Sequence, residues 1–200
     1  MNSTRKFVLF FWIVTSLYGI YFSINYSSTP GESSKWSEPW PEQSQLKFEP
    51  DKFNFVVFLH PECDCSKATL NQIEEIVKDA GSEKIHYLAV FLLPEKMRIA
   101  WGESDLLKRT RGIKNLQIYI DDQKEFQRFG VKTSGQTLIF GPSKDLLFSG
   151  GLTVARGHIG VSMGQDFVLS LFKGRDLAKN KIDKKINLTP VFGCQTEEKN

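Results

Sequence analysis

The chain has 200 residues, of which 40% are hydrophobic and 24% are charged, with 26 basic and 23 acidic side chains. This length suits one domain of ordinary size plus an anchor or a tail, and the composition excludes a fibrous or wholly disordered chain. A net charge of +3 with scattered basic residues predicts no nucleic-acid partner, and three cysteines are too few for a disulfide framework.

The first segment is an apolar run from Phe7 to Ile24 that follows Arg5 and Lys6 and contains no charged residue. As a helix it would span roughly 27 Å, close to the roughly 30 Å of a hydrocarbon core. It is long and aromatic and lacks a small-residue cleavage site, which favours an uncleaved anchor at 1–25 over a removed signal sequence. Because a positive flank stays in the cytoplasm, we expect a single-pass inner-membrane protein with its C-terminal domain in the periplasm or on the extracytoplasmic face.

Residues 26–47 are rich in Ser, Pro and Glu, which predicts an extended tether. Trp36 and Trp40 are unusual in so polar a stretch. We expect these two side chains to pin the tether to the folded domain or to the membrane interface.

The predicted domain, residues 48–177, alternates short apolar runs with amphipathic segments. Continuous apolar runs are typical of strands buried on both faces, and one apolar face is typical of a helix. In chain order the patterns predict strand 53–60, helix 66–81, strand 84–93, helix 103–112, strand 115–121, helix 122–130, strands 136–141 and 144–151, and helix 164–174. Helical crossovers require parallel strands, whereas the short turn "GPSK" makes the last two strands an antiparallel hairpin. The sequence therefore predicts a three-layer α/β domain with a mixed sheet.

The last part of the chain carries two further features. A glycine-rich stretch before the last helix holds Arg156 and His158; it is a candidate anion-binding loop or a surface loop, and it lacks the pattern of a nucleotide-binding loop. Residues 178–200 form a predicted C-terminal tail with a basic, solvated run, and the tail carries Cys194.

The stretch "FLHPECDCSKATL" places Cys63 and Cys65 between the first predicted strand and the helix after it. Residues two apart in a helix point to nearly opposite sides, so these cysteines can pair only in the loop, in a small strained ring. A helix N-terminus favours a thiolate, which predicts thiol–disulfide chemistry here. His60 is a candidate base or cation beside Cys63, or a strand-end histidine satisfied by the backbone. Cys194 is a candidate resolving thiol or a structural partner, and three pairings remain open.

The layout resembles that of membrane-tethered periplasmic thioredoxin-like proteins over roughly Phe48 to Lys173. The segments "HPECDCS", "TSGQTLIF", "GGLTVARGH" and "TPVFGC" are similar to a subgroup labelled RedB-like. The resemblance implies a thioredoxin-like fold preceded by one transmembrane helix, a reactive cysteine at Cys63, and no cofactor. It also implies, as partner, an exported protein with a thiol or a disulfide.

Two positions depart from that family pattern. The spacing is C-x-C where the family has C-x-x-C, so Ser66 stands at the position of the second cysteine. The place of the family's cis-proline falls near Gly135 and Gln136, and no proline is present there. The missing proline favours a third hypothesis, a non-catalytic interaction module.

We expect a thiol–disulfide oxidoreductase with a C-x-C centre, in which Cys63 attacks and Cys65 or Cys194 resolves. The alternative is a copper or zinc protein. In that case Cys63, Cys65 and a histidine, His60 or His158, would hold the metal, since thiolates suit both ions.

Overall fold

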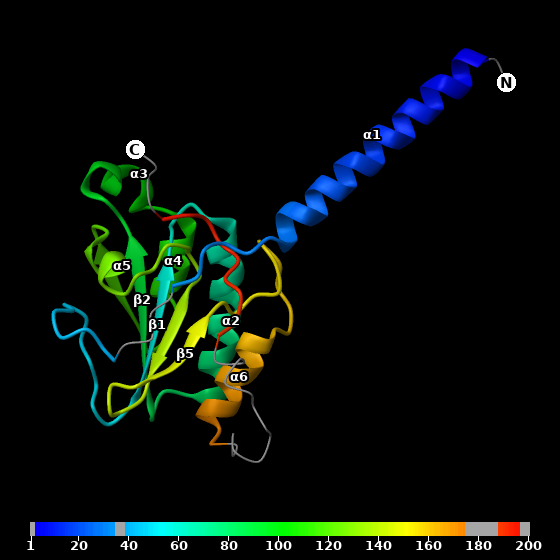
Figure 1. The fold of residues 1–200 in the computed structure, drawn as a ribbon. Helices are drawn as coiled ribbons and strands as arrows, with labels where there is room; N and C mark the ends of the chain where they lie inside the picture. The colour runs from blue at the N-terminus through cyan, green and yellow to red at the C-terminus, as the bar shows by residue number, and fades with distance from the viewer. Residues whose placement is uncertain (1–2, 35–38, 175–187, 197–200) are drawn as a thin grey trace.

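The computed structural model of the chain describes residues 3–34, 39–174 and 188–196. Helix α1 projects from a body that contains all the other elements (Figure 1). In chain order the elements are α1 (Ser3–Ser28), β1 (Phe53–Leu59), α2 (Asp64–Ala80), β2 (Ile85–Leu92), the 3₁₀ helix η1 (Glu95–Met97), α3 (Arg98–Trp101), α4 (Asp105–Arg111), β3 (Leu116–Asp121), α5 (Lys124–Arg128), β4 (Thr137–Phe140), β5 (Leu146–Gly150) and α6 (Met163–Phe172).

The strands form one mixed sheet in the order β3-β2-β1-β4-β5. Strands β1, β2 and β3 run parallel because each connection between them contains a helix. Strand β4 pairs antiparallel with both β1 and β5, so the hairpin forms one side of the sheet. The predicted α/β fold, thioredoxin-like with a mixed central sheet, is confirmed, and a long apolar helix precedes it.

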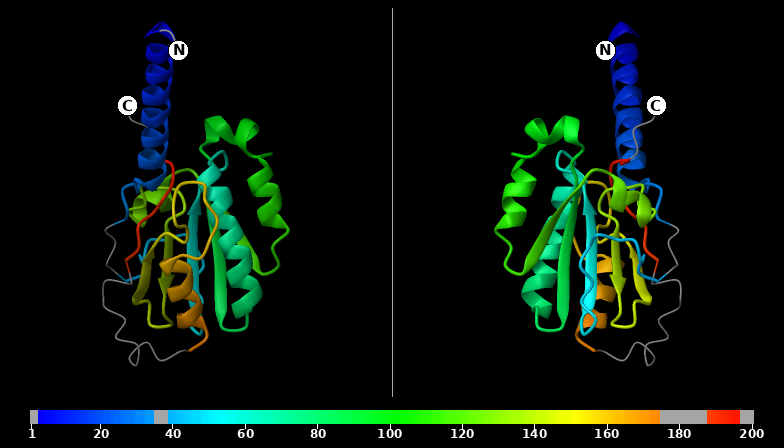
Figure 2. Two further views of the ribbon diagram at one scale, coloured as in Figure 1. Left: turned by 90° about the vertical axis from the view of Figure 1, so that its right-hand side faces the viewer. Right: turned by 90° about the vertical axis from the view of Figure 1, so that its left-hand side faces the viewer.

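Helices cover the sheet on both faces, which gives the three layers (Figure 2). On one face α2, α4 and α6 pack against the strands, and Leu70, Leu107 and Phe167 lie in that apolar core. On the other face α5 and the segment that follows residue 39 close a second core around Trp40 and Phe126. Both faces of β1 and β2 are therefore buried, as their continuous apolar runs predict.

The structure differs from the predicted elements at two places. Helix α2 begins at Asp64, two residues before the predicted apolar-periodic segment, although Cys65 lies in its first turn and Cys63 directly before it, as expected. The helical stretch from Glu95 to Trp101 was not predicted, because so short a segment carries no repeating apolar face.

The predicted tether lies partly against the domain. The Trp40 ring is buried, so the expectation that this tryptophan pins the segment to the domain is confirmed, whereas Trp36 lies outside the described residues. Closer to α1, the Ser34 N–H donates to Gln136 Oε1 at 3.1 Å. The Gly31 N–H donates to Val191 O at 2.8 Å.

The described part of the predicted C-terminal tail, residues 188–196, lies against the domain, and we call it the C-terminal strap. Val191 is fully buried, and Leu188 forms a parallel bridge with Ser149 of β5. Burial of this apolar side chain and main-chain hydrogen bonds hold the strap on the domain. The basic residues 175–187 lie outside the described part of the chain.

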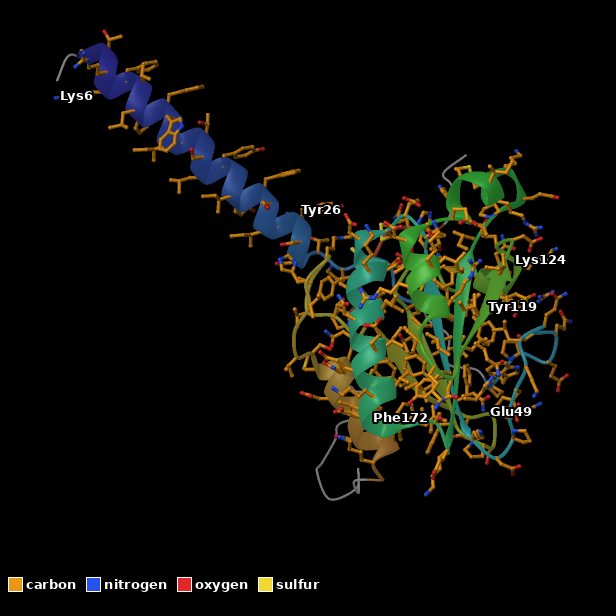
Figure 3. The ribbon with its side chains drawn as sticks, turned by 180° about the vertical axis from the view of Figure 1, so that it is seen from behind. Lys6, Tyr26, Glu49, Tyr119, Lys124 and Phe172 are labelled. Atoms are coloured by element: carbon orange, nitrogen blue, oxygen red, sulfur yellow. A yellow bond between two sulfur atoms is a disulfide. The ribbon has the colours of Figure 1, made fainter. Side chains whose placement is uncertain are left out.

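Helix α1 has the length and the apolar composition of a membrane-spanning helix, and a signal sequence near the N-terminus has the same two properties. Figure 3 shows Tyr26 where α1 meets the body, with Lys6 at the far end of the helix. Glu49 and Phe172 lie toward the opposite end of the body (Figure 3). The body thus meets α1 at the end that holds the N-terminus of α2 (Figure 1).

Candidate functional site: a disulfide at the start of helix α2

Cys63 is the N-cap residue of α2, immediately after the carboxyl end of β1. Its backbone is extended, its N–H donates to His60 O at 3.2 Å, and its carbonyl accepts the N–H of Lys67 at 3.2 Å. No side-chain hydrogen bond caps the helix here. Cys63 stands at the positive end of the helix dipole, which favours a thiolate.

The structure selects one of the three cysteine pairings that the sequence leaves open. Cys63 forms a disulfide with Cys194, which lies 131 residues later in the strap, and their Cα atoms are 6.4 Å apart. Cys65 is a buried free thiol. The expected pairing within the C-x-C motif is thus not the one present. The physical reason is that α2 begins at Asp64, which turns Cys65 to the far side of the first turn.

The strap reaches Cys63 by pairing with the backbone that leads into β4. The Ser134 N–H donates to Cys194 O at 2.9 Å, and the Thr196 N–H donates to Lys132 O at 3.0 Å. Gln195 and Thr133, between these bonds, form an antiparallel bridge. Two main-chain bonds therefore fix the register that brings the two sulfurs together.

Ser134 touches both halves of the disulfide. Its buried hydroxyl donates to Cys63 Sγ at 3.3 Å and accepts the N–H of Cys194 at 3.0 Å. Sequence reasoning missed this serine. The available signal was its position directly before Gly135 and Gln136, where the family resemblance places the loop that faces the cysteines.

A pocket of about 650 Å³ opens beside the disulfide, and Cys65 and Cys194 both line it. Lys67, Arg156 and Tyr26 contribute to its walls, so cationic and aromatic groups from three parts of the chain meet there. Cys194 is an exposed residue, whereas Cys63 is only 1% exposed. A molecule that enters the pocket therefore meets Cys194 before it meets Cys63.

Arg156 joins the end of α1 to the strap. Its guanidinium donates to Gly193 O and, at 3.0 Å, to Thr29 O, and it lies 5.3 Å from the centre of the Tyr26 ring. The loop that carries Arg156 therefore folds back to the thiol end of the domain. The exposed His158 ring instead has Nδ1 2.6 Å from Arg156 O, in its own loop.

His60 and Ser66 hold the loop between β1 and α2. The His60 Nδ1 accepts the N–H of Glu62 at 3.2 Å, and its ring packs edge-on against Trp101 at 4.6 Å. Burial lowers the pKa of His60, and the nearby Glu62 raises it less, so the ring is neutral at neutral pH. Ser66 Oγ accepts the backbone N–H of His60 at 3.1 Å. These contacts are those of a histidine satisfied by the backbone, the simpler of the two expectations.

Gly135 and Gln136 shape the backbone that faces the cysteines. Gly135 has a φ of 86°, and a Cβ there would lie 2.9 Å from Thr69 Oγ1, so a side chain would be strained and crowded. The buried Gln136 side chain accepts the N–H of Ser34 and donates to Ser149 Oγ at 2.9 Å. Gln136 therefore binds the segment after α1 to the sheet.

The ligand set of the metal alternative is not assembled in the described residues. No group of three His, Cys, Asp or Glu side chains in that part of the chain is placed to hold a metal ion. Cys63 is in a disulfide, and the rings of His60 and His158 contact other groups.

No family model and no curated protein matches the chain. Among solved structures, an uncharacterised conserved protein from Geobacillus kaustophilus is 15% identical with a TM-score of 0.59, over 86% of this chain and 95% of that one. A hypothetical protein from Sinorhizobium meliloti is 14% identical with a TM-score of 0.57, over 85% of this chain and 96% of that one. These two likenesses show a shared fold. The pneumococcal exposed lipoprotein thioredoxin of Streptococcus pneumoniae is 23% identical with a TM-score of 0.42, over 62% and 86% of the two chains.

Proposed function

We propose that this protein is a membrane-tethered, extracytoplasmic thiol–disulfide oxidoreductase whose reactive pair is Cys63 and Cys194. The observation that carries the proposal is their disulfide, which joins the N-cap of α2 to a separate strap beside an open pocket. A cysteine stabilised as a thiolate at a helix N-terminus is both a ready nucleophile and a good leaving group.

In the reducing direction the Cys63 thiolate attacks a client disulfide. The Cys63–client bond forms, and the second client sulfur leaves as a thiolate that takes a proton from solvent. Cys194 then attacks Cys63 Sγ, which re-forms the internal disulfide and releases the client thiol. Two electrons pass from the protein dithiol to the client, and the same steps in reverse oxidise a client dithiol.

Cys65, the second cysteine of the C-x-C motif, is the third thiol of the proposed redox centre. It lines the same pocket as Cys194 and is 7% exposed, so it borders the space in which a mixed disulfide would lie. Because α2 turns Cys65 away from Cys63, Cys65 is proposed to meet a client sulfur in the pocket and not to pair with Cys63.

The proposed location is the inner membrane, crossed once by α1, with the body in the periplasm. The support is the apolar helix, its basic residues Arg5 and Lys6, and the contact of Arg156 with both Tyr26 and Thr29. If α1 spans the bilayer, these contacts hold the pocket close to the membrane surface. The clients are then exported proteins whose thiols or disulfides come near that surface.

The test is exchange with oxidised glutathione, measured by mass mapping of the reduced full-length protein in detergent. Wild type and Cys65→Ser are expected to form the Cys63–Cys194 disulfide and release two equivalents of reduced glutathione. Cys194→Ser in the Cys65→Ser background should stop at glutathione attached to Cys63.

Cys63→Ser is the matched control, since it keeps the other two thiols. Its thiols should react with oxidised glutathione more slowly than those of the wild type, because Cys63 is the proposed nucleophile. Equal rates in wild type and Cys63→Ser, or glutathione first found on Cys65 or Cys194, would overturn the assignment of Cys63 as the nucleophile.

A further inference from the structure

The strap is held by the main chain in the manner of an added strand. Two of its hydrogen bonds, from the Ser134 N–H to Cys194 O and from the Thr196 N–H to Lys132 O, join backbone atoms, and they flank the bridge between Thr133 and Gln195. The side chains of Ser134 and Arg156 bind the strap backbone as well. Because main-chain bonds do not depend on side-chain identity, an extended peptide other than the strap can make them along this segment wherever its side chains fit. The residues before β4 therefore form a track for an extended chain, and the strap occupies it.

This track determines which sulfur can reach Cys63. With the strap in place Cys63 is 1% exposed, and Cys194, held by Ser134, is bonded to it. An external sulfur must approach Cys63 from the position that Cys194 now occupies. The strap and a client segment therefore exclude each other.

Gly193 shows what the track requires of its occupant. A Cβ on Gly193 would overlap the carbonyl oxygen of Ser134 and lie 2.8 Å from its carbonyl carbon. These are backbone atoms of the loop that enters β4, so they cannot move aside as a flexible side chain would. Gln195, on the other side of Cys194, is exposed. The residue directly before the cysteine must be glycine, whereas the residue after it is unrestricted.

We infer that the strap is a built-in occupant of the client track, and that clients present an extended segment in which glycine directly precedes the reactive cysteine. This inference rests on the proposed function and names its substrate class. An external dithiol reduces the Cys63–Cys194 disulfide and is itself oxidised to a disulfide; this exchange frees the strap, and the client's Gly-Cys segment takes its place. Cys63 bonds to the client cysteine while the client's other sulfur leaves. The returning strap then breaks that bond through Cys194 and expels the reduced client.

The experiment uses the full chain with Cys65→Ser and Cys194→Ser, so that Cys63 is its one thiol. The probes are symmetric disulfides of the strap peptide LTPVFGCQT, which yield only a Cys63–peptide adduct and one free peptide thiol. One variant peptide replaces the glycine before the cysteine with valine. A matched control replaces the glutamine after the cysteine with valine, so both variants carry the same new side chain.

The adduct is expected to form about tenfold more slowly with the glycine-to-valine peptide, a difference of about 1.4 kcal/mol, because the new Cβ would overlap the backbone of Ser134. The control peptide should react within about twofold of the strap peptide, because its substitution faces solvent. Adding Gly193→Val to the protein should speed the reaction of the strap peptide, because its own strap is expelled.

Equal rates for the two valine peptides would overturn the inference, as would no acceleration by Gly193→Val in a variant that unfolds at the same temperature as its parent. The reaction of Cys63 with oxidised glutathione is the control that distinguishes failure of this inference from failure of the proposed function. If Cys63 reacts with glutathione disulfide but does not distinguish the peptides, only the inference fails. If Cys63 reacts with neither probe, the proposed function fails as well.

Discussion

At the scale of single residues, Ser134 connects the two halves of the disulfide, because one hydroxyl contacts Cys63 Sγ and the N–H of Cys194. In the reduced protein the same hydroxyl is placed to donate to the Cys63 thiolate. Hydrogen bonds to a charged group contribute about 1.5–3 kcal/mol, more than neutral ones. Ser134 is therefore a positioning residue for Cys63, together with the start of α2.

Ser134→Ala should raise the pH midpoint of Cys63 alkylation by about one unit, because the thiolate loses a charge-assisted donor. The measurement is alkylation rate against pH in the background of Cys65→Ser and Cys194→Ser. In that background the parent midpoint should lie below about 8.5, the value of an unperturbed thiol, because of the helix dipole. A Ser134→Ala midpoint equal to that of the parent would show that the hydroxyl does not act on the thiolate.

His60 makes stability depend on pH. Burial lowers the pKa of this ring in the folded state, so the unfolded chain binds more protons below about pH 6.5. The free energy of unfolding should therefore fall as the pH is lowered from about 6.5 toward 5. His60→Phe keeps an aromatic ring against Trp101 but cannot titrate, and it should flatten this slope. Denaturant unfolding at a series of pH values gives the free energy of unfolding of the wild type and of His60→Phe. The same dependence on pH in both proteins would exclude His60 as its cause.

The residues of the candidate site differ in how far sequence could predict them. Cys63 and Cys65 were predicted because two cysteines between a strand and a helix form a local pattern. The pairing of Cys63 with Cys194 depends on a contact across 131 residues, and no local pattern encodes that choice. Ser134 was missed because a serine in a polar loop carries no signal until the strap is placed against it.

At the scale of elements, the start of α2 decides the chemistry. The helix begins at Asp64, so Cys63 has an extended backbone, and its side chain is not oriented by the helix. Cys65 lies within the helix and is turned away from Cys63. The strands were predicted well because buried parallel strands leave continuous apolar runs. The strap was not predicted, since its apolar residues are few and its bonds come from the backbone.

Trp40 is one of the apolar side chains, with Leu46 and Phe48, that hold the segment before β1 on the sheet. Its ring centroid lies 5.2 Å from Phe48, 5.3 Å from Phe129 and 5.2 Å from Phe140. Trp40→Ala should lower the free energy of unfolding by about 3 to 5 kcal/mol, the usual cost for a buried aromatic ring. Chemical denaturation with the disulfide intact measures it. Trp101→Ala is the comparison, because Trp101 is only half-buried and should cost less; equal losses would contradict the assignment.

At the scale of the whole molecule, the segment that follows α1 and the C-terminal strap meet at the candidate site. The segment after α1 bonds to the strap through Gly31 and Val191, and Arg156 contacts both. The fold class was predictable because it depends on the order of strands and helices. The contact between the segment after α1 and the strap was not predictable, since the sequence shows a polar tether and a tail in which only Cys194 indicates a link to the site.

The anchor makes a prediction that concerns the intact protein. If α1 is uncleaved and spans the membrane, protein extracted from membranes should contain peptides from before Asn25. Mass spectrometry of the membrane and soluble fractions measures this directly. A mature N-terminus after Ile24 in the soluble fraction would show that the segment is a signal sequence.

The central claim is that the Cys63–Cys194 disulfide is a working redox pair rather than a permanent crosslink. The direct measurement is equilibration of the full chain in glutathione buffers of graded potential, with the oxidised fraction of this pair read by mass mapping. The account predicts a reversible transition between about −180 and −300 mV, where exchanging dithiols lie. A disulfide that stays oxidised throughout that range, like the structural disulfides of secreted proteins, would contradict it.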